Sequence, residues 1–199
     1  MPLFEHIDGA TPLDDTSGLI PTHIQVQADL DEWEAANILK ANRKYLSGNK
    51  QFTAKIEWLK KVHKDMFDET WEWAGKFRVS NVGLGIDWHN IPEQVKVLVD
   101  DIEYWNRADN GLNIFEQSVR IHHRLVKIHP FKNGNGRHAR LISDIFLFSN
   151  EQKLPFWPDF KLIKEKNMRQ IYIDALHDAD KGDYKPLEKF TKDLVEPSI

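Results

Sequence analysis

Apolar positions recur at the spacing of one helix face along most of this 199-residue chain. Six stretches share the pattern, with polar side chains filling the positions between the apolar ones. They lie at residues 56–67, 92–105, 115–128, 137–148, 164–179 and 185–194. The pattern therefore predicts a succession of amphipathic helices.

The N-terminal part of the chain has a different pattern. Residues 1–25 mix prolines and glycines with polar residues, which is typical of an irregular arm, and the apolar members predict that this arm packs on the body. Asp29 or Asp31 is placed to cap a helix that follows. We expect residues 1–54 to form an arm and helix packed on a domain that spans residues 55–195.

Composition narrows the class of protein. With 41% hydrophobic and 29% charged residues, the chain has an ordinary globular composition. A net charge of −4 gives no sign of a nucleic-acid or membrane surface, and the absence of cysteine excludes disulfides and thiolate zinc sites. The start of the chain lacks a secretion signal, and the longest apolar run, residues 145–148, is too short to cross a bilayer. We therefore expect a cytoplasmic soluble protein.

The segment from His129 to Arg140 combines a histidine, two glycines and two arginines between two helical patterns. Pro130 disfavours the α conformation at His129, so the preceding helix should end there. Gly134 and Gly136 allow unusual backbone angles, and successive N–H groups in such a turn can form an anion-binding nest. The helix that begins at about residue 137 adds free N–H groups and a dipole that favour a phosphate.

Arg137 and Arg140 are three residues apart, so they occupy neighbouring positions on one helix face. Both can bind phosphate oxygens in a bidentate way. The alternative is an ordinary Gly-Asn-Gly turn between two helices, followed by solvated arginines. On the residues alone, both interpretations stay open.

The segment also resembles the signature of the Fic family, His-Pro-Phe-x-(Asp/Glu)-Gly-Asn-Gly-Arg-x-x-Arg. Every fixed position matches except Asn133, where the family has an acid. Residues 71–78 resemble the Trp-Ala-Gly-x-Phe-Arg stretch that precedes the Fic flap, and residues 172–187 resemble the usual C-terminal sequence. The resemblance covers about residues 55–190. It implies an all-α fold, a Fic-type helical bundle with a short β-hairpin flap over the active site.

The resemblance implies an activity, transfer of AMP from ATP to a Ser, Thr or Tyr hydroxyl of a target protein. His129 is then the general base, because a neutral imidazole can accept the hydroxyl proton. Backbone amides of the turn and two arginines would hold the phosphates, and Asn135 would fix the turn. The residues expected to bind ATP and its phosphates are Asn133, Gly134, Asn135, Gly136, Arg137 and Arg140. Phe131 is interpreted as a packed anchor, whereas Lys132 and His138 are expected to face solvent.

The expected flap spans about residues 79–91 and mixes β-forming residues with turn glycines, as a hairpin should. In the family it covers the active site and holds the target segment by main-chain pairing. The residues expected to dock the target are Val79, Ser80, Asn81, Val82, Gly83, Leu84, Gly85 and Ile86. The alternative is a surface hairpin without a partner.

Asn133 affects the expected cofactor. The family's acid at this position binds Mg²⁺ beside the phosphates, and a hard cation prefers a carboxylate. With an amide there, three consequences are open: weaker metal affinity, Mg²⁺ held mainly by the phosphates, or a different donor substrate. Relatives with altered loops transfer phosphate or phosphocholine, so a kinase-like transfer is a second candidate function.

Two further classes compete with a transferase. One is a histidine metal hydrolase that uses His122, His123, His129 and His138, although no His-Glu-x-x-His element or carboxylate partner supports it. The other is a catalytically weak module that binds only a nucleotide or a protein partner, and Asn133 is its best support.

Regulation is a separate question. Some Fic proteins carry an inhibitory helix with the pattern Ser/Thr-x-x-x-Glu-(Gly/Asn), whose glutamate pairs with the second motif arginine. Glu34 lies on a suitable helix, but Leu30 and Ala35 break the pattern, so Glu34 is interpreted mainly as a solvated charge. The chain also resembles a compact bacterial subgroup found beside a helix-turn-helix protein. We therefore expect that a small antitoxin-like or helix-turn-helix protein supplies the restraint.

Overall fold

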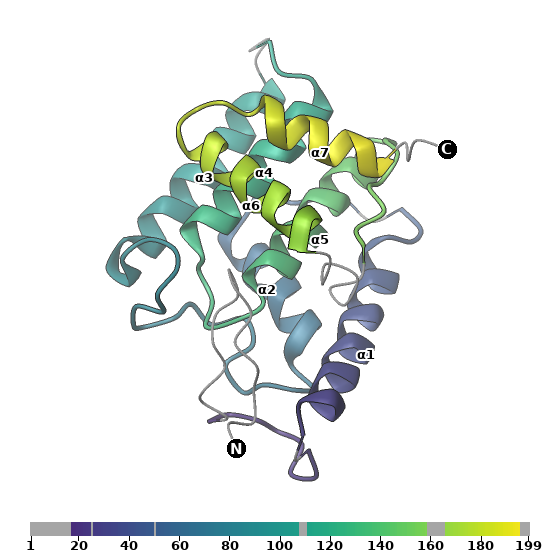
Figure 1. Ribbon diagram of the computed structural model, residues 1–199, viewed down its shortest axis with the longest axis vertical. Helices are drawn as coiled ribbons and strands as arrows, with labels where there is room; N and C mark the ends of the chain where they lie inside the picture. Colours follow the sequence, from purple (N-terminus) through teal and green to yellow (C-terminus); the bar gives the residue numbers. More distant parts are fainter. Residues whose placement is uncertain (1–16, 25, 50, 108–110, 159–165, 196–199) are drawn as a thin grey trace.

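The computed structural model describes residues 17–24, 26–49, 51–107, 111–158 and 166–195, and helices dominate this part of the chain (Figure 1). The all-α prediction is confirmed. In chain order the elements are α1 (Gln27–Tyr45), α2 (Ile56–Phe67), the 3-10 turn η1 (Trp88–Asn90), α3 (Ile91–Arg107), α4 (Ile114–Ile128), α5 (Asn135–Ser149), α6 (Lys166–Asp180) and α7 (Lys185–Val195).

Helix α4 is the centre of the fold, because it packs against α3 and α5 and also against α6 and α7. Its start is fixed locally by a capping box: the Asn113 side chain accepts from the Glu116 backbone N–H, and the Glu116 carboxylate accepts from the Asn113 N–H. One side of α4 buries Ile121 and Leu125 in the main core, where they meet the apolar residues of α5. The helix ends at Ile128, so its C-terminal end delivers the histidine that follows.

Helix α1 packs along α2, and its buried side includes Leu30, Ala41 and Tyr45 (Figure 1). The predicted aspartate cap is wrong. The N-cap is Val26, in extended conformation and without a side-chain hydrogen bond, and Asp29 lies inside the first turn. A carboxylate there still favours the helix through its dipole.

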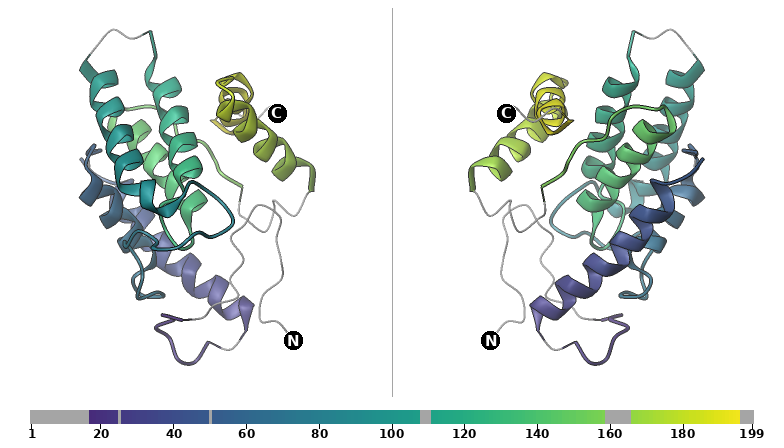
Figure 2. Two further views of the ribbon diagram at one scale, coloured as in Figure 1. Left: turned by 90° about the vertical axis from the view of Figure 1, so that its left-hand side faces the viewer. Right: turned by 90° about the vertical axis from the view of Figure 1, so that its right-hand side faces the viewer.

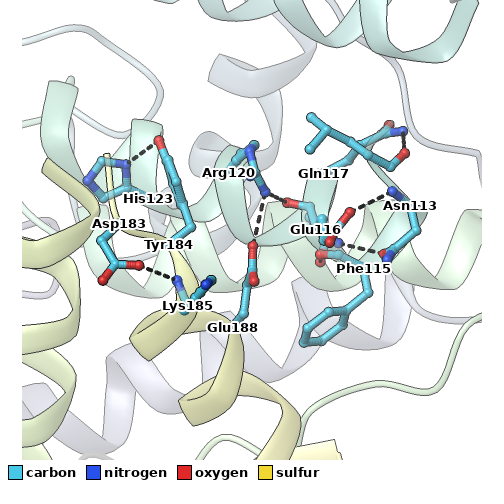
Figure 3. Close-up of polar contacts among 12 residues, drawn as sticks. Asn113, Phe115, Glu116, Gln117, Arg120, His123, Asp183, Tyr184, Lys185 and Glu188 are labelled. Carbon is cyan, nitrogen blue, oxygen red and sulfur yellow. Dashed lines mark hydrogen bonds and ion pairs between the residues drawn. The ribbon is translucent and has the colours of Figure 1, made fainter. Parts of the chain in front are cut away.

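Helices α6 and α7 form a pair that stands beside α4 (Figure 2). Leu187 and Ala179 share a small apolar cluster with Val119 of α4. Polar contacts fix the same interface: Arg120 donates to the Glu188 carboxylate at 3.1 Å, and the Tyr184 hydroxyl lies 3.2 Å from Nδ1 of His123 (Figure 3). This pair therefore holds a fixed place at one side of the bundle. The first residues of the predicted 164–179 helix lie outside the described residues.

The predicted β-hairpin at residues 79–91 does not form. These residues are all described, and no backbone pairing joins residues 79–82 to residues 84–87. Gly83 and Gly85 have positive φ, as turn glycines do, but the loop is closed by hydrogen bonds from the Arg78 side chain. An arginine fork thus takes the place of the cross-strand amide bonds that a hairpin would need.

The N-terminal arm is described only from Ser17, so its predicted packing can be followed over residues 17–24. There Leu19 pairs with Trp71 in an antiparallel bridge, and the Ile20 N–H donates to the Thr70 carbonyl at 2.9 Å. Residues 1–16 of the predicted arm lie outside the described residues. Among the helices that the structure describes, none combines the length and the apolar character needed to cross a membrane.

Candidate active site

The turn between α4 and α5 is closed by Asn135. Its side-chain oxygen accepts from the Phe131 N–H at 2.8 Å, and its amide nitrogen donates to the Phe131 carbonyl at 2.9 Å. Phe131 itself is fully buried beneath the turn. Gly134 has φ of +75°, and a Cβ there would come within 2.5 Å of the Phe67 ring. Both its backbone angle and its close packing therefore require glycine at this position.

Helix α5 begins inside this turn, at Asn135, and no side chain caps its N-terminus. The first backbone N–H groups of a helix have no intrahelical acceptor, and together with the dipole they attract an anion. The N–H of Gly134 is already taken, since it donates to the Asn133 side-chain oxygen at 2.7 Å. The amides offered to a phosphate are therefore those of residues 135–137.

His129 is the C-cap of α4 and adopts the left-handed conformation, with φ 53° and ψ 60°. Its side chain is only 9% exposed, and the ring makes a hydrogen bond to the Val126 carbonyl. Burial, assisted by the charge of Arg78, lowers the pKa of His129 to about 4. The imidazole is thus neutral near pH 7. Because one ring nitrogen donates to Val126, the other is an acceptor.

Arg137 and Arg140 leave α5 toward different elements. Arg137 forms an ion pair with Glu34 of α1 at 2.5 Å and lies over the Phe67 ring. Arg140 lies over the Trp157 ring and is hydrogen-bonded to Tyr172 of α6. The two guanidinium groups are therefore held by different elements.

Glu34 is not the solvated charge that the sequence suggested. It is only 6% exposed, and its second carboxylate oxygen accepts from the Trp71 indole N–H at 2.7 Å. Its partner is the first motif arginine, Arg137, and not the second. The carboxylate therefore occupies one side of an arginine that was predicted to hold phosphates.

The loop of residues 79–86 lies against the catalytic histidine candidate. A Cβ on Gly85 would come within 2.3 Å of the His129 Cβ and 2.9 Å of the Ile128 carbonyl. At the other end of the loop, Val79 is 77% exposed. The loop thus contacts His129 with one side and offers the other to solvent.

Residues 52–147 match the sequence profile of the Fic/DOC family. The predicted resemblance to the Fic family is confirmed over these residues. Among curated relatives, a protein adenylyltransferase Fic of Culex quinquefasciatus is 27% identical over 201 residues, which cover 97% of this chain and 39% of the relative. A protein adenylyltransferase fic-1 of Caenorhabditis elegans is 32% identical over 128 residues, covering 63% and 24%. The chain thus spans about two fifths or less of the length of these relatives.

Solved structures of Fic proteins share the fold. BepC from Bartonella tribocorum, determined with bound AMPPNP, superposes with a TM-score of 0.65 at 20% identity and covers 88% of this chain and 90% of that chain. Fic-1 (residues 134–508) from C. elegans gives a TM-score of 0.68 at 22% identity and covers 89% and 52%. The helical bundle described above is therefore the Fic fold.

Two histidines, His63 and His138, lie beneath the turn between α4 and α5, and the sequence did not identify them as part of the site. Nε2 of His63 lies 3.1 Å from the Asn133 carbonyl, while its Nδ1 accepts from the Gly75 N–H at 3.0 Å. The ring stacks on Phe131 with centroids 3.7 Å apart. The only signal in the sequence was the place of His63 on the apolar stripe of α2, which indicates burial.

The prediction that His138 faces solvent is wrong. The side chain is 1% exposed, and Nε2 donates to the Leu59 carbonyl at 3.0 Å. Lys132 is half-buried and its Nζ lies 3.2 Å from the Ser17 hydroxyl. Residue 138 follows the start of α5 by one turn, so it points into the core together with the apolar residues of that helix.

The structure also shows whether the histidines and Asn133 are placed to bind a metal ion. His122, His123 and His138 each have a separate partner, Tyr172, Asp180 and Leu59. Within the described residues, no group of three histidine or acidic side chains is arranged to hold a metal. The turn between α4 and α5, residues 129–140, contains no aspartate or glutamate, and the uncharged Asn133 oxygen already accepts from the Gly134 N–H, so this turn offers Mg²⁺ no carboxylate ligand.

Proposed function

We propose that this chain is a protein adenylyltransferase, which transfers AMP from ATP to a Ser, Thr or Tyr hydroxyl of a target protein. The observation that carries the proposal is a buried, neutral His129 beside the uncapped amides at the start of α5. Relatives named protein adenylyltransferase Fic support it, as do related structures with bound AMPPNP or ADP.

In the proposed reaction, the acceptor nitrogen of His129 takes the proton of the attacking hydroxyl. The hydroxyl oxygen forms a bond to the α-phosphorus, and the bond from that phosphorus to the bridging oxygen breaks, so that pyrophosphate leaves. Backbone amides of residues 135–137 and the guanidinium groups of Arg137 and Arg140 stabilise the charge on the leaving group. A Mg²⁺ ion in this reaction would be bound through the phosphates and would neutralise part of their charge.

The donor can be tested with two labels. Purified protein, alone and with a cell lysate, is incubated with ATP labelled at the α-phosphate or at the γ-phosphate. We expect covalent label on protein only from the α-labelled ATP, because AMP is the group transferred. Label from the γ-phosphate alone would instead identify a kinase-like transfer, one of the alternatives that Asn133 leaves open. If neither label is transferred but nucleotide still binds, the chain is a module that only binds nucleotide.

We further propose that restraint of the site lies within the chain. Because Glu34 pairs with Nη1 of Arg137, its carboxylate competes with a phosphate for this arginine when nucleotide binds. A separate antitoxin-like protein is then not needed to supply the glutamate. A target protein remains the expected partner, docked at residues 79–86.

Glu34→Gln is expected to raise the transfer rate by about 10-fold, because loss of one charge-assisted contact frees Arg137 for the phosphates. Glutamine keeps an oxygen for the Trp71 indole, so α1 should stay in place. The measurement is the initial rate of α-label transfer, with Glu32→Gln on the exposed side of α1 as the matched control. An unchanged or lower rate in Glu34→Gln would show that the ion pair does not restrain the enzyme.

A further inference from the structure

The Arg78 side chain donates its hydrogen bonds to uncharged acceptors, although the residue is only 5% exposed. Nε donates to the His129 carbonyl at 2.7 Å, and Nη1 donates to the Ser80 carbonyl at 2.8 Å. Nη2 donates to the Ile86 carbonyl. One planar fork therefore binds the histidine and both ends of the loop at once.

The two loop carbonyls bracket the tip of the predicted docking segment. Ser80 precedes the tip and Ile86 follows it, so the guanidinium group sets the distance between them. Asn81 reinforces this closure, since its oxygen accepts from the Trp88 N–H at 3.0 Å and its amide nitrogen donates to Asp87 at 3.2 Å. The shape of the loop thus depends on side chains at its base.

The same arginine fixes the backbone on which the candidate base is mounted. His129 is one of the two non-glycine residues with positive φ among the described residues, and such a conformation needs support from its surroundings. Arg78 binds this segment twice: its side chain holds the His129 carbonyl, and its backbone N–H donates to the Pro130 carbonyl at 2.9 Å. Gly85 then brings the loop into contact with the His129 side chain.

We propose that Arg78 is the positioning residue that aligns the target-docking loop, residues 79–86, with His129. Its role is to place the attacking hydroxyl within reach of the base, and it acts through the backbone and not on the substrate. The inference rests on the proposed function, because alignment matters only if His129 accepts the hydroxyl proton. No hydrogen bond joins the Arg78 side chain to residues 135–140, all of which the structure describes, so we expect nucleotide binding to be independent of this alignment.

The test compares Arg78→Ala with Arg124→Ala, which removes an arginine from an ion pair with Asp101 between α4 and α3. In Arg78→Ala we expect self-labelling from α-labelled ATP to fall by about 100-fold, while the affinity for AMPPNP changes by less than about 2-fold. Ethylguanidine should restore part of the rate by filling the vacated fork, and methylamine should not. Arg124→Ala should keep the rate.

A second measurement does not depend on activity. Hydrogen–deuterium exchange of the full chain should be faster at residues 79–87 in Arg78→Ala and unchanged at residues 133–140. Normal exchange at the loop, a normal labelling rate, or parallel loss of rate and AMPPNP affinity would each overturn the proposal. If the unmodified protein transfers no label, the proposed function fails, and exchange alone then decides whether Arg78 fixes the loop.

Discussion

His129→Asn is expected to lower the rate of AMP transfer by about 100- to 10,000-fold, the usual contribution of a general base. Asparagine suits this position, because it tolerates the left-handed conformation that His129 adopts and its amide can still donate to the Val126 carbonyl. The asparagine side chain cannot accept a proton near pH 7. The substitution therefore removes the chemistry and leaves the turn largely intact.

The expected loss should appear in the rate and not in nucleotide binding. The phosphates are assigned to residues 135–140, so the affinity for AMPPNP should stay within about 2-fold of the unmodified protein. His177→Asn, on the exposed side of α6, is the matched control and should change neither quantity. Transfer that stays within about 3-fold in His129→Asn would exclude His129 as the base.

Local patterns were sufficient for the helices. The apolar stripe at residues 56–67 became α2 with the same limits, because every turn of that helix buries a side chain that the 3.6-residue period predicts. The end of α4 was likewise readable from Pro130, which leaves the last helical residue at Ile128. These features depend on residues that are close in sequence.

The side-chain partners of the site depend on contacts that no local pattern contains. Glu34 meets Trp71 and Arg137 across 37 and 103 residues of sequence. Leu30, four residues before it, and the adjacent Ala35 do not fit the inhibitory pattern, so the sequence did not predict the burial of its carboxylate. The choice of Arg137 as partner follows from the way α1 packs along α2, which only the fold determines.

The loop at residues 79–86 differs from the predicted hairpin for a related reason. Its β-forming residues and glycines predicted a hairpin, in which each arm satisfies the other's backbone. Instead, the preceding residue, Arg78, supplies the donors for the carbonyls of Ser80 and Ile86. The acceptors of Arg78 could not be predicted from the sequence, because they depend on how the loop packs against the end of α4.

The protein is expected to lose stability steeply as the pH falls from about 6.5 toward 4. Burial lowers the pKa of five histidines. The pKa falls to about 4 for His129 and His138, to about 3 for His122 and well below the ordinary value for His63, and that of His123 shifts in the same direction. In the unfolded chain they titrate near 6.5, so between these values the unfolded state binds more protons. Linkage then requires stability to fall as the pH falls.

Asp144 acts in the opposite direction. Burial raises the pKa of its carboxyl to about 7, although the Trp157 indole N–H and Arg140 favour the charged form. Between its ordinary value and pH 7, the folded state therefore binds one proton more than the unfolded state at this residue. Near pH 5 the balance is about three protons in favour of the unfolded state, which gives a slope of about 4 kcal/mol per pH unit.

Integrated from pH 6.5 to 4, this slope amounts to about 5 to 10 kcal/mol, which is comparable with the whole free energy of unfolding of a typical domain. Urea unfolding at a series of pH values measures it directly. His138→Gln should reduce the slope by about 1.4 kcal/mol per pH unit, because glutamine can still donate to the Leu59 carbonyl but does not titrate. His177→Gln, at an exposed position, should leave the slope unchanged. A flat stability profile between pH 6.5 and 4 would mean that these histidines do not stay neutral in the folded protein, and the neutral base assigned to His129 would fail with them.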